Sequence, residues 1–236
     1  MRLLGLVIFL WSVAHVLGNT EIVNFEAQET VSVDLQFTRS WYVPVLHSGS
    51  STLIWNLTAT PVGFSTSDIC PSLGKWRPDD AESMKLCPHE LWLALDLESD
   101  GHWKNFNKFT LRLSWPAFFP TDVSMKIYDP IDLAAFSENP QSISSHATSR
   151  LKYARLRLSF AGVLSPSAPP VPDGVPIFII LEPLFFGVLM PSVIPTILAI
   201  VVIVVLGIPT GIKINSYLQK IAQLARQNMS TSRKSD

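Results

Sequence analysis

A long stretch without any charged side chain lies between Glu182 and Lys213. Its densest part, Leu184 to Ile208, would be apolar on every face of a helix, and a soluble domain of this size has no surface able to cover it. At about 1.5 Å per residue this part is longer than the ~30 Å hydrocarbon core of a bilayer. The sequence therefore predicts one transmembrane helix over residues 183–212.

The charges on the two sides of this stretch predict its orientation. Residues 213–236 carry five basic side chains and one acidic one, whereas residues 19–182 carry 18 acidic and 12 basic ones. Basic residues accumulate on the cytoplasmic side of a span. We therefore expect a type I protein with a basic cytoplasmic tail over residues 213–236. An acidic N-terminal part also argues against a nucleic-acid binder, which needs a concentrated positive face.

Two further features concern the predicted span and its tail. Pro191 and Pro195 each remove a helical hydrogen bond, which predicts a kink in the first half of the span. The carbonyl groups that they free need partners, supplied either locally or by a neighbouring membrane helix. Apolar residues at roughly helical spacing between Lys213 and Gln227 predict a short interfacial helix that continues the span, with a simple stop-transfer tail as the alternative.

The N-terminus has the pattern of a secretory signal. Arg2 precedes an apolar run, Leu3 to Leu10, and small or modest side chains lie ahead of residue 19. An uncleaved anchor helix is the alternative, but Ser12 and His15 interrupt the apolar run, which is short for a span. We expect a signal peptide over residues 1–18.

Short runs of β-forming residues fill the region between the signal and the span. In Phe109–Trp115 apolar and polar side chains alternate, which is typical of a strand with one buried face. Proline and glycine clusters separate such runs, and six or seven strands at this spacing predict a sandwich. The expected fold is mainly β, with a lumenal β-sandwich-like domain over residues 19–164. The runs are Val31–Phe37, Ser51–Leu57, Leu91–Leu97, Phe109–Trp115, Val123–Tyr128, Arg155–Phe160 and Ile177–Leu181.

A proline-rich segment follows this domain. Residues 165–176 contain five prolines and favour an extended, semi-rigid backbone. We interpret residues 165–182 as a membrane-proximal segment. The alternative is a loop between the last two strands, with Ile177–Leu181 returning to the sheet.

Cys70 and Cys87 are the only two cysteines of the chain. In an oxidising compartment such a pair most simply forms one disulfide, which would stabilise the fold by roughly 3 kcal/mol. A zinc site formed by both cysteines with His89 and His102 is the alternative. The cysteine spacing lacks the close C-x₂₋₄-C pair of structural zinc motifs and therefore favours the disulfide.

Two short motifs predict processing and location. Asn56-Leu57-Thr58 is an acceptor for N-glycosylation, provided that Asn56 faces solvent in its predicted strand. Arg233 and Lys234 stand four and three residues from the C-terminus, as in dilysine-type retrieval signals of endoplasmic-reticulum type I proteins.

Chemistry-bearing motifs are scarce. The sequence contains no nucleophile elbow, H-E-x-x-H, phosphate loop or dinucleotide fingerprint. Asp79-Asp80 and the acidic set Asp96, Glu98 and Asp100 are typical of solvated loops, and the histidines lack a nucleophile nearby. We expect no catalytic, metal or cofactor-binding residues, and interpret the lumenal part as a binding or scaffolding module.

Two segments carry a resemblance to a known family. The expected mature start, Asn19-Thr20-Glu21-Ile22-Val23-Asn24-Phe25, is similar to the N-terminus of the fungal GPI-mannosyltransferase II co-activator family. The segment from Leu111 to Asp122, with the letters LRLSWPAFFPTD, resembles the same family. The overall layout also matches. Trp115 lies on the apolar side of its strand, so we expect a structural role for the Ser-Trp-Pro-Ala part.

The resemblance implies a specific role. Members of the family are non-catalytic subunits in the endoplasmic-reticulum membrane, where a multispanning mannosyltransferase adds the second mannose of the GPI core. The chain would then be an accessory subunit and not an enzyme, with that catalytic subunit as its partner and no cofactor. The alternatives are an accessory subunit of another GPI mannosylation step, or a type I adhesion or cargo-receptor protein.

Overall fold

The computed structural model describes residues 18–33, 43–70, 87–98, 101–135, 143–163 and 174–232. The chain divides into two units, residues 1–188 and residues 189–236. The first unit, called the β-domain, consists mainly of strands. The second contains one long apolar helix. The predicted fold class, mainly β with a C-terminal helix able to cross a membrane, is confirmed.

Sheet A is an antiparallel sheet of four strands in the order β1-β6-β10-β4. β6 lies in its centre and follows the alternation seen in the sequence, because Phe109, Leu111 and Leu113 on one face are fully buried. β1 pairs with β6 along its whole length, from Gly18 opposite Pro116 to Glu26 opposite Lys108. The strands are β1 (Gly18–Glu26), β4 (Thr52–Leu57), β6 (Lys108–Pro116) and β10 (Val175–Pro183).

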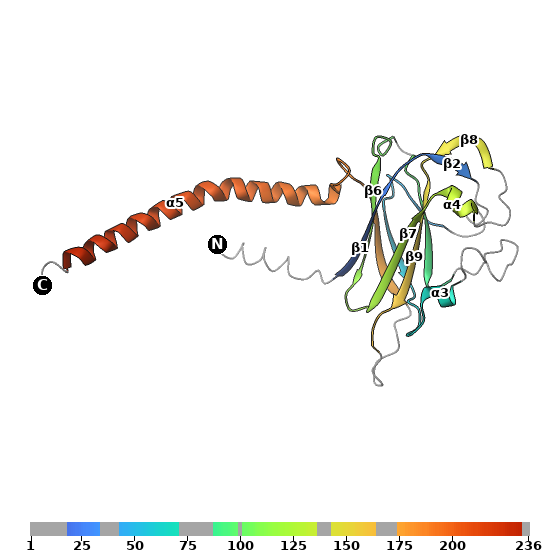
Figure 1. Cartoon of the computed structure of the whole chain (residues 1–236), viewed down its shortest axis with the longest axis horizontal. Helices are drawn as coiled ribbons and strands as arrows, with labels where there is room; N and C mark the ends of the chain where they lie inside the picture. Colours follow the sequence, from blue (N-terminus) through green and yellow to red (C-terminus); the bar gives the residue numbers. More distant parts are fainter. Residues whose placement is uncertain are drawn as a thin grey trace. The chain divides into compact units, whose positions relative to one another are not determined.

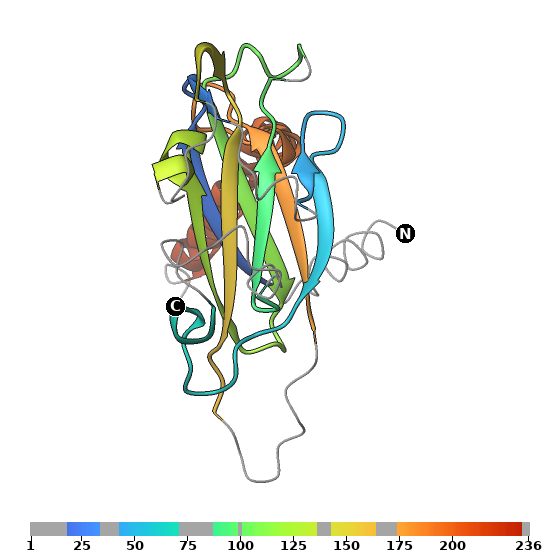
Figure 2. The same ribbon diagram turned by 90° about the vertical axis from the view of Figure 1, so that its right-hand side faces the viewer.

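Sheet C faces sheet A and has the order β3-β5-β9-β7. β3 is parallel to β5, and the other neighbours are antiparallel. Figure 2 shows the strands of the β-domain running in nearly the same direction, as expected for an aligned sandwich. The strands are β3 (Val45–Leu46), β5 (Glu90–Leu95), β7 (Thr121–Tyr128) and β9 (Lys152–Phe160).

The main core lies between these two sheets. Leucine and isoleucine side chains from the inner faces of β6 and β10 meet leucines from β5 and β9. Leu113, Ile179, Leu93 and Leu156 have no exposed surface, and burial of each such side chain contributes about 1.5–3 kcal/mol. The alternation of each strand therefore fixes which of its residues enter the core.

A second, smaller core lies on the outer face of sheet C. Here β2 (Thr30–Val33) pairs with β8 (Ile143–Ser149), and α4 (Pro130–Ala135) packs beside them. Figure 1 shows these three elements together on one side of the sandwich. Apolar side chains of β2 and α4, namely Val33, Leu133 and Ala134, pack with Trp92, Ala94 and Tyr153 of sheet C. The part of sheet C around Trp92 and Tyr153 is therefore buried on both faces, whereas Ser124 and Lys126 of β7 stay exposed.

The helical unit begins with the 3-10 turn η2 (Pro191–Val193) and continues as α5 (Ile194–Ser232). α5 has 39 residues and is about 58 Å long, so it exceeds the hydrocarbon thickness of a bilayer. Residues Pro191–Leu224 are long and apolar enough to cross a membrane. The helix continues past Lys213, which confirms helical structure over residues 213–227.

Three predictions about this region need correction. Residues 175–183 form β10 in the centre of sheet A, so the alternative of a strand returning to the sheet is correct and the boundary expected at residue 164 is too early. The helix begins at Pro191 and not at residue 183. Pro191 and Pro195 lie in its first turns, where a proline removes no helical bond, so no kink follows from them. The proline inside the helix is Pro209.

The predicted strands agree with the structure within a few residues, apart from Val31–Phe37, whose last four residues lie outside the described part. β1, β3 and β8 were not expected. Residues 1–17 also lie outside it, so the signal peptide stays a prediction.

Candidate functional site

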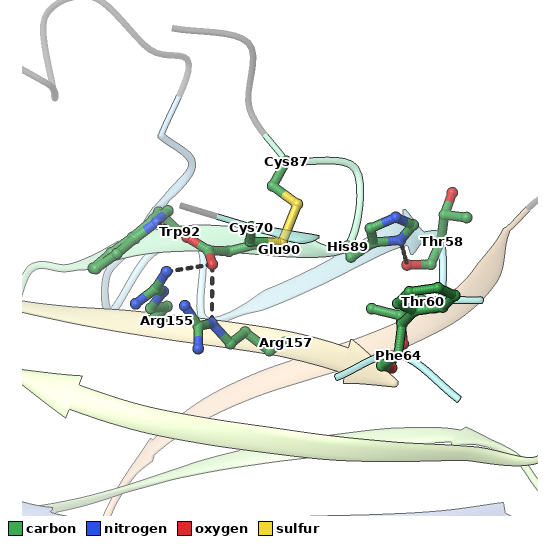
Figure 3. Close-up of a disulfide and its surroundings, with 10 residues drawn as sticks. All are labelled: Thr58, Thr60, Phe64, Cys70, Cys87, His89, Glu90, Trp92, Arg155 and Arg157. Carbon is green, nitrogen blue, oxygen red and sulfur yellow. Dashed lines mark hydrogen bonds and ion pairs between the residues drawn. A yellow bond between two sulfur atoms is a disulfide. The ribbon is translucent and has the colours of Figure 1, made fainter. Parts of the chain in front are cut away.

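A buried charge cluster lies on the covered face of sheet C (Figure 3). Glu90 begins β5, and the antiparallel register places it opposite Arg157 of β9, with Trp92 opposite Arg155. Its Oε2 atom lies 2.6 Å from Arg155 Nη2 and 3.0 Å from Arg157 Nε, while Trp92 Nε1 donates to Oε1 at 2.6 Å. The Arg155 guanidinium also lies 5.2 Å above the Trp92 ring. The ion pairs of this cluster link β5 to β9.

The disulfide lies next to this cluster. Cys70 directly follows the short helix α3 (Thr66–Ile69), Cys87 precedes β5, and the two sulfur atoms are bonded, in agreement with the expected pairing. The zinc alternative fails because both sulfur atoms are used. Figure 3 shows His89 beside the disulfide, with its Nδ1 atom 3.0 Å from the Thr58 carbonyl oxygen. The disulfide and the His89–Thr58 hydrogen bond together link the segment over residues 58–70 to the start of β5.

Arg150 provides a similar anchor near the loop that precedes β6. Its buried guanidinium donates to the carbonyl oxygens of Ala27, Trp103, Lys104 and Phe106. A charged donor with several carbonyl acceptors forms stronger hydrogen bonds than a neutral one. Arg150 therefore orders the loop over residues 101–107.

Two residues of the predicted acidic loop, Asp96 and Glu98, make hydrogen bonds that stabilise the fold. Asp96 Oδ1 accepts a hydrogen bond from the Glu98 backbone N–H at 3.0 Å, and Glu98 lies near the Arg150 backbone N–H. Asp79, Asp80 and Asp100 lie outside the described residues. Within the described ranges, no group of three or more His, Cys, Asp and Glu side chains is arranged to hold a metal ion.

A shallow cleft of about 260 Å³ opens beside the end of β7. Tyr128, Gln28 and Phe25 line it together with four charged residues: Lys152 and Asp129, which form an ion pair, and Glu26 and Asp132. The ammonium of Lys152 is buried, so the pair joins β9 to the loop that leads into α4. The cleft thus combines one ion pair with two further carboxylates, and its lining contains no serine, threonine or cysteine that could act as a nucleophile.

The outer face of sheet A differs, because an apolar pair is left uncovered there. Ile54 of β4 lies directly opposite Phe178 of β10, and their side chains are 64% and 46% exposed. Ile22 of β1 is also exposed. A cross-strand apolar pair of this kind offers contact area to a partner. We call Ile54 and Phe178 the open pair.

Asn56 lies two residues beyond Ile54 on the same strand. Its side chain is exposed, and β4 is an edge strand of sheet A. The geometry required for use of the glycosylation acceptor is therefore present. Glycosylation itself stays a prediction, as does the retrieval signal, because Arg233 and Lys234 lie outside the described residues.

Residues 111–122 form the end of β6, the following turn and the start of β7. Trp115 is buried in the main core, as expected for a structural role. Phe118, in the turn, is 77% exposed, and its ring contacts that of Phe119 in a tilted arrangement with centroids 4.4 Å apart. Neither the open pair nor Arg150 was expected. Strand alternation could have indicated the open pair, but the Arg150 anchor depends on folded loops.

Comparison of the chain with protein families, with curated proteins and with solved structures finds no match.

Proposed function

We propose that the chain is a non-catalytic accessory subunit of the endoplasmic-reticulum GPI mannosyltransferase II. In this proposal α5 crosses the membrane with the β-domain on the lumenal side and residues 213–236 in the cytoplasm. The partner is the multispanning catalytic subunit, which adds the second mannose to the GPI core. The chain supplies binding surface and stability, while the chemistry belongs to the partner.

One observation carries the proposal: the β-domain presents an uncovered apolar pair, while its described buried charges serve the scaffold. Glu90 is saturated by two arginines and a tryptophan, and Lys152 is paired with Asp129. Such a domain, attached to an apolar helix, is suited to bind another membrane protein. The resemblance of residues 19–25 and 111–122 to the co-activator family gives that partner its identity.

The test is affinity purification of the full chain in mild detergent, together with lipid-linked precursor analysis of depleted cells. We expect recovery of a polytopic mannosyltransferase and accumulation of a GPI precursor with one mannose. A precursor without mannose would assign the chain to the first mannosylation step instead. Normal GPI precursors after depletion, with the chain at the cell surface or in transport vesicles, would favour an adhesion or cargo-receptor role.

A further inference from the structure

A tight turn with exposed apolar side chains ends the β-domain just before the apolar helix. Phe186 is 98% exposed and Val188 is 78% exposed, although both are large apolar residues. The turn is held in place at its base, because Leu184 is buried and its N–H donates to the Lys108 carbonyl oxygen at 2.8 Å. The Phe185 ring packs edge-on against Phe106, with centroids 5.1 Å apart.

The backbone of this turn is unusual for the residues it contains. Phe186 has φ +53° and Gly187 has φ +74°, and the Val188 N–H donates to the Phe185 carbonyl oxygen at 3.1 Å. Two consecutive positive φ values are typical of type I′ turns, whose first central position strongly favours asparagine, aspartate or glycine. Phenylalanine is strained there. Strain at an exposed aromatic side chain points to a function for that side chain.

The covalent connection places this turn close to the expected bilayer. About 20 helical residues span the hydrocarbon core, so counting back from Lys213, the first charged residue after the apolar run, puts the core boundary near Val193. Val188 lies five residues earlier, at most about 17 Å away even for a fully extended chain. The turn is therefore within reach of the headgroup layer, where aromatic side chains are enriched.

Another exposed phenylalanine of a strand connection, Phe118, lies at the opposite end of sheet A. Phe118 follows β6, whereas the Leu184–Val188 turn is bonded to Lys108 at the start of β6. The nine residues of β6 separate these two ends by about 26 Å. Asn56, the glycosylation acceptor, pairs with Pro176 near the Phe118 end. A membrane contact at the Lys108 end would leave this acceptor clear of the lipid.

We propose that the Leu184–Val188 turn is an interfacial lipid anchor: Phe186 and Val188 enter the bilayer surface and hold the Lys108 end of the β-domain against the membrane. The occupant is lipid and not a protein, because the turn is tethered within reach of the headgroup layer whether or not a partner is present. This inference rests on the membrane span of the proposed function, but not on the mannosyltransferase partner.

Environment-sensitive labels on the full chain in phosphatidylcholine nanodiscs test the anchor. One label each is placed through Phe186→Cys, Phe118→Cys and Leu198→Cys, without reduction of the native disulfide. We expect shallow spin-labelled lipid to quench the label at position 186 and iodide to quench the label at 118. Leu198 reports on the span itself. If its label is not quenched by deep spin-labelled lipid, the span fails, whereas quenching at 198 without quenching at 186 overturns the anchor alone.

A second variant separates a lipid anchor from a structural turn. Phe186→Asn suits the positive φ of this position, so the β-domain should keep or gain thermal stability. Combined with Val188→Asn, it should abolish lipid quenching of a label placed through His102→Cys in the exposed loop that precedes β6. Unfolding of Phe186→Asn, or unchanged quenching at 102, would overturn the proposal. So would a label at 186 that is shielded in native microsomes but water-exposed in the nanodisc, because a protein would then cover the turn.

Discussion

The two outer faces of the sandwich are treated differently. On sheet C, a second layer of β2, β8 and α4 covers Trp92 and Tyr153. On sheet A, the open pair of Ile54 and Phe178 keeps about half or more of its side-chain surface exposed. Both faces carry large side chains and an ion pair, but Arg155 and Glu90 on the covered face are only 7% and 8% exposed, against 25% and 14% for Arg112 and Glu182 on sheet A.

This difference gives the two faces different roles: the covered face stabilises the fold, and the open face is available for binding. A charge cluster that is removed from water has to be satisfied within the fold, so Glu90, Arg155 and Arg157 are committed to the scaffold. An exposed apolar pair contributes little to the fold and leaves surface available for a partner. We therefore expect substitutions on the covered face to change stability, and substitutions on the open face to change binding.

The largest effect is expected for Glu90→Ala. Removing this carboxylate leaves Arg155 and Arg157 side by side without their counter-charge, and loss of one partner from a buried ion pair destabilises by about 3–5 kcal/mol. Chemical denaturation of the full chain in detergent, followed by tryptophan fluorescence, measures the change. Glu26→Ala is the matched control, because the pair of Glu26 with Lys108 is exposed at 3.8 Å and contributes about 0–1 kcal/mol. Equal effects of the two substitutions would contradict the comparison.

Sheet A shows how far the sequence alone predicts this fold. The alternation in Phe109–Trp115 predicts both the strand and its buried face, because one period-two pattern decides which side chains enter the core. β1 could not be predicted in this way, because it is an edge strand whose inner face is only partly buried. β10 was expected as a strand, but the prolines ahead of it favoured a domain boundary. Its central position follows from pairing with both β6 and β4.

The charge cluster on the covered face of sheet C could not be predicted from the sequence, for a different reason. Glu90 and Arg157 are 67 residues apart, and only the register of β5 against β9 brings them together. Burial of β5 on both faces gives a continuous apolar run, which does not identify the layer that covers it. The disulfide was predictable because the chain has only two cysteines. The helix start at Pro191 was missed because the apolar run begins earlier, within the Leu184–Val188 turn.

An intermediate effect is expected for removal of the disulfide beside the charge cluster. Cys70→Ser combined with Cys87→Ser frees the loop between them in the unfolded chain, which lowers stability by about 3 kcal/mol. The same denaturation measurement detects it, and reduction of the unaltered chain should reproduce the loss. If the double substitution leaves the denaturation midpoint unchanged, the disulfide does not stabilise this side of the sandwich.

The smallest effect on stability, but the largest on binding, is expected for the open pair. Ile54→Thr with Phe178→Thr keeps β-forming residues at exposed positions, so each substitution should change the unfolding free energy by no more than about 0.5 kcal/mol. Recovery of the catalytic subunit in mild detergent should nevertheless fall, because the apolar contact is lost. Phe118→Thr is the control, since this residue is also apolar and exposed but lies in the turn after β6 and not on the outer face of sheet A. Full recovery with the double variant would show that the partner binds elsewhere, and the open face of sheet A would then lose its assigned role.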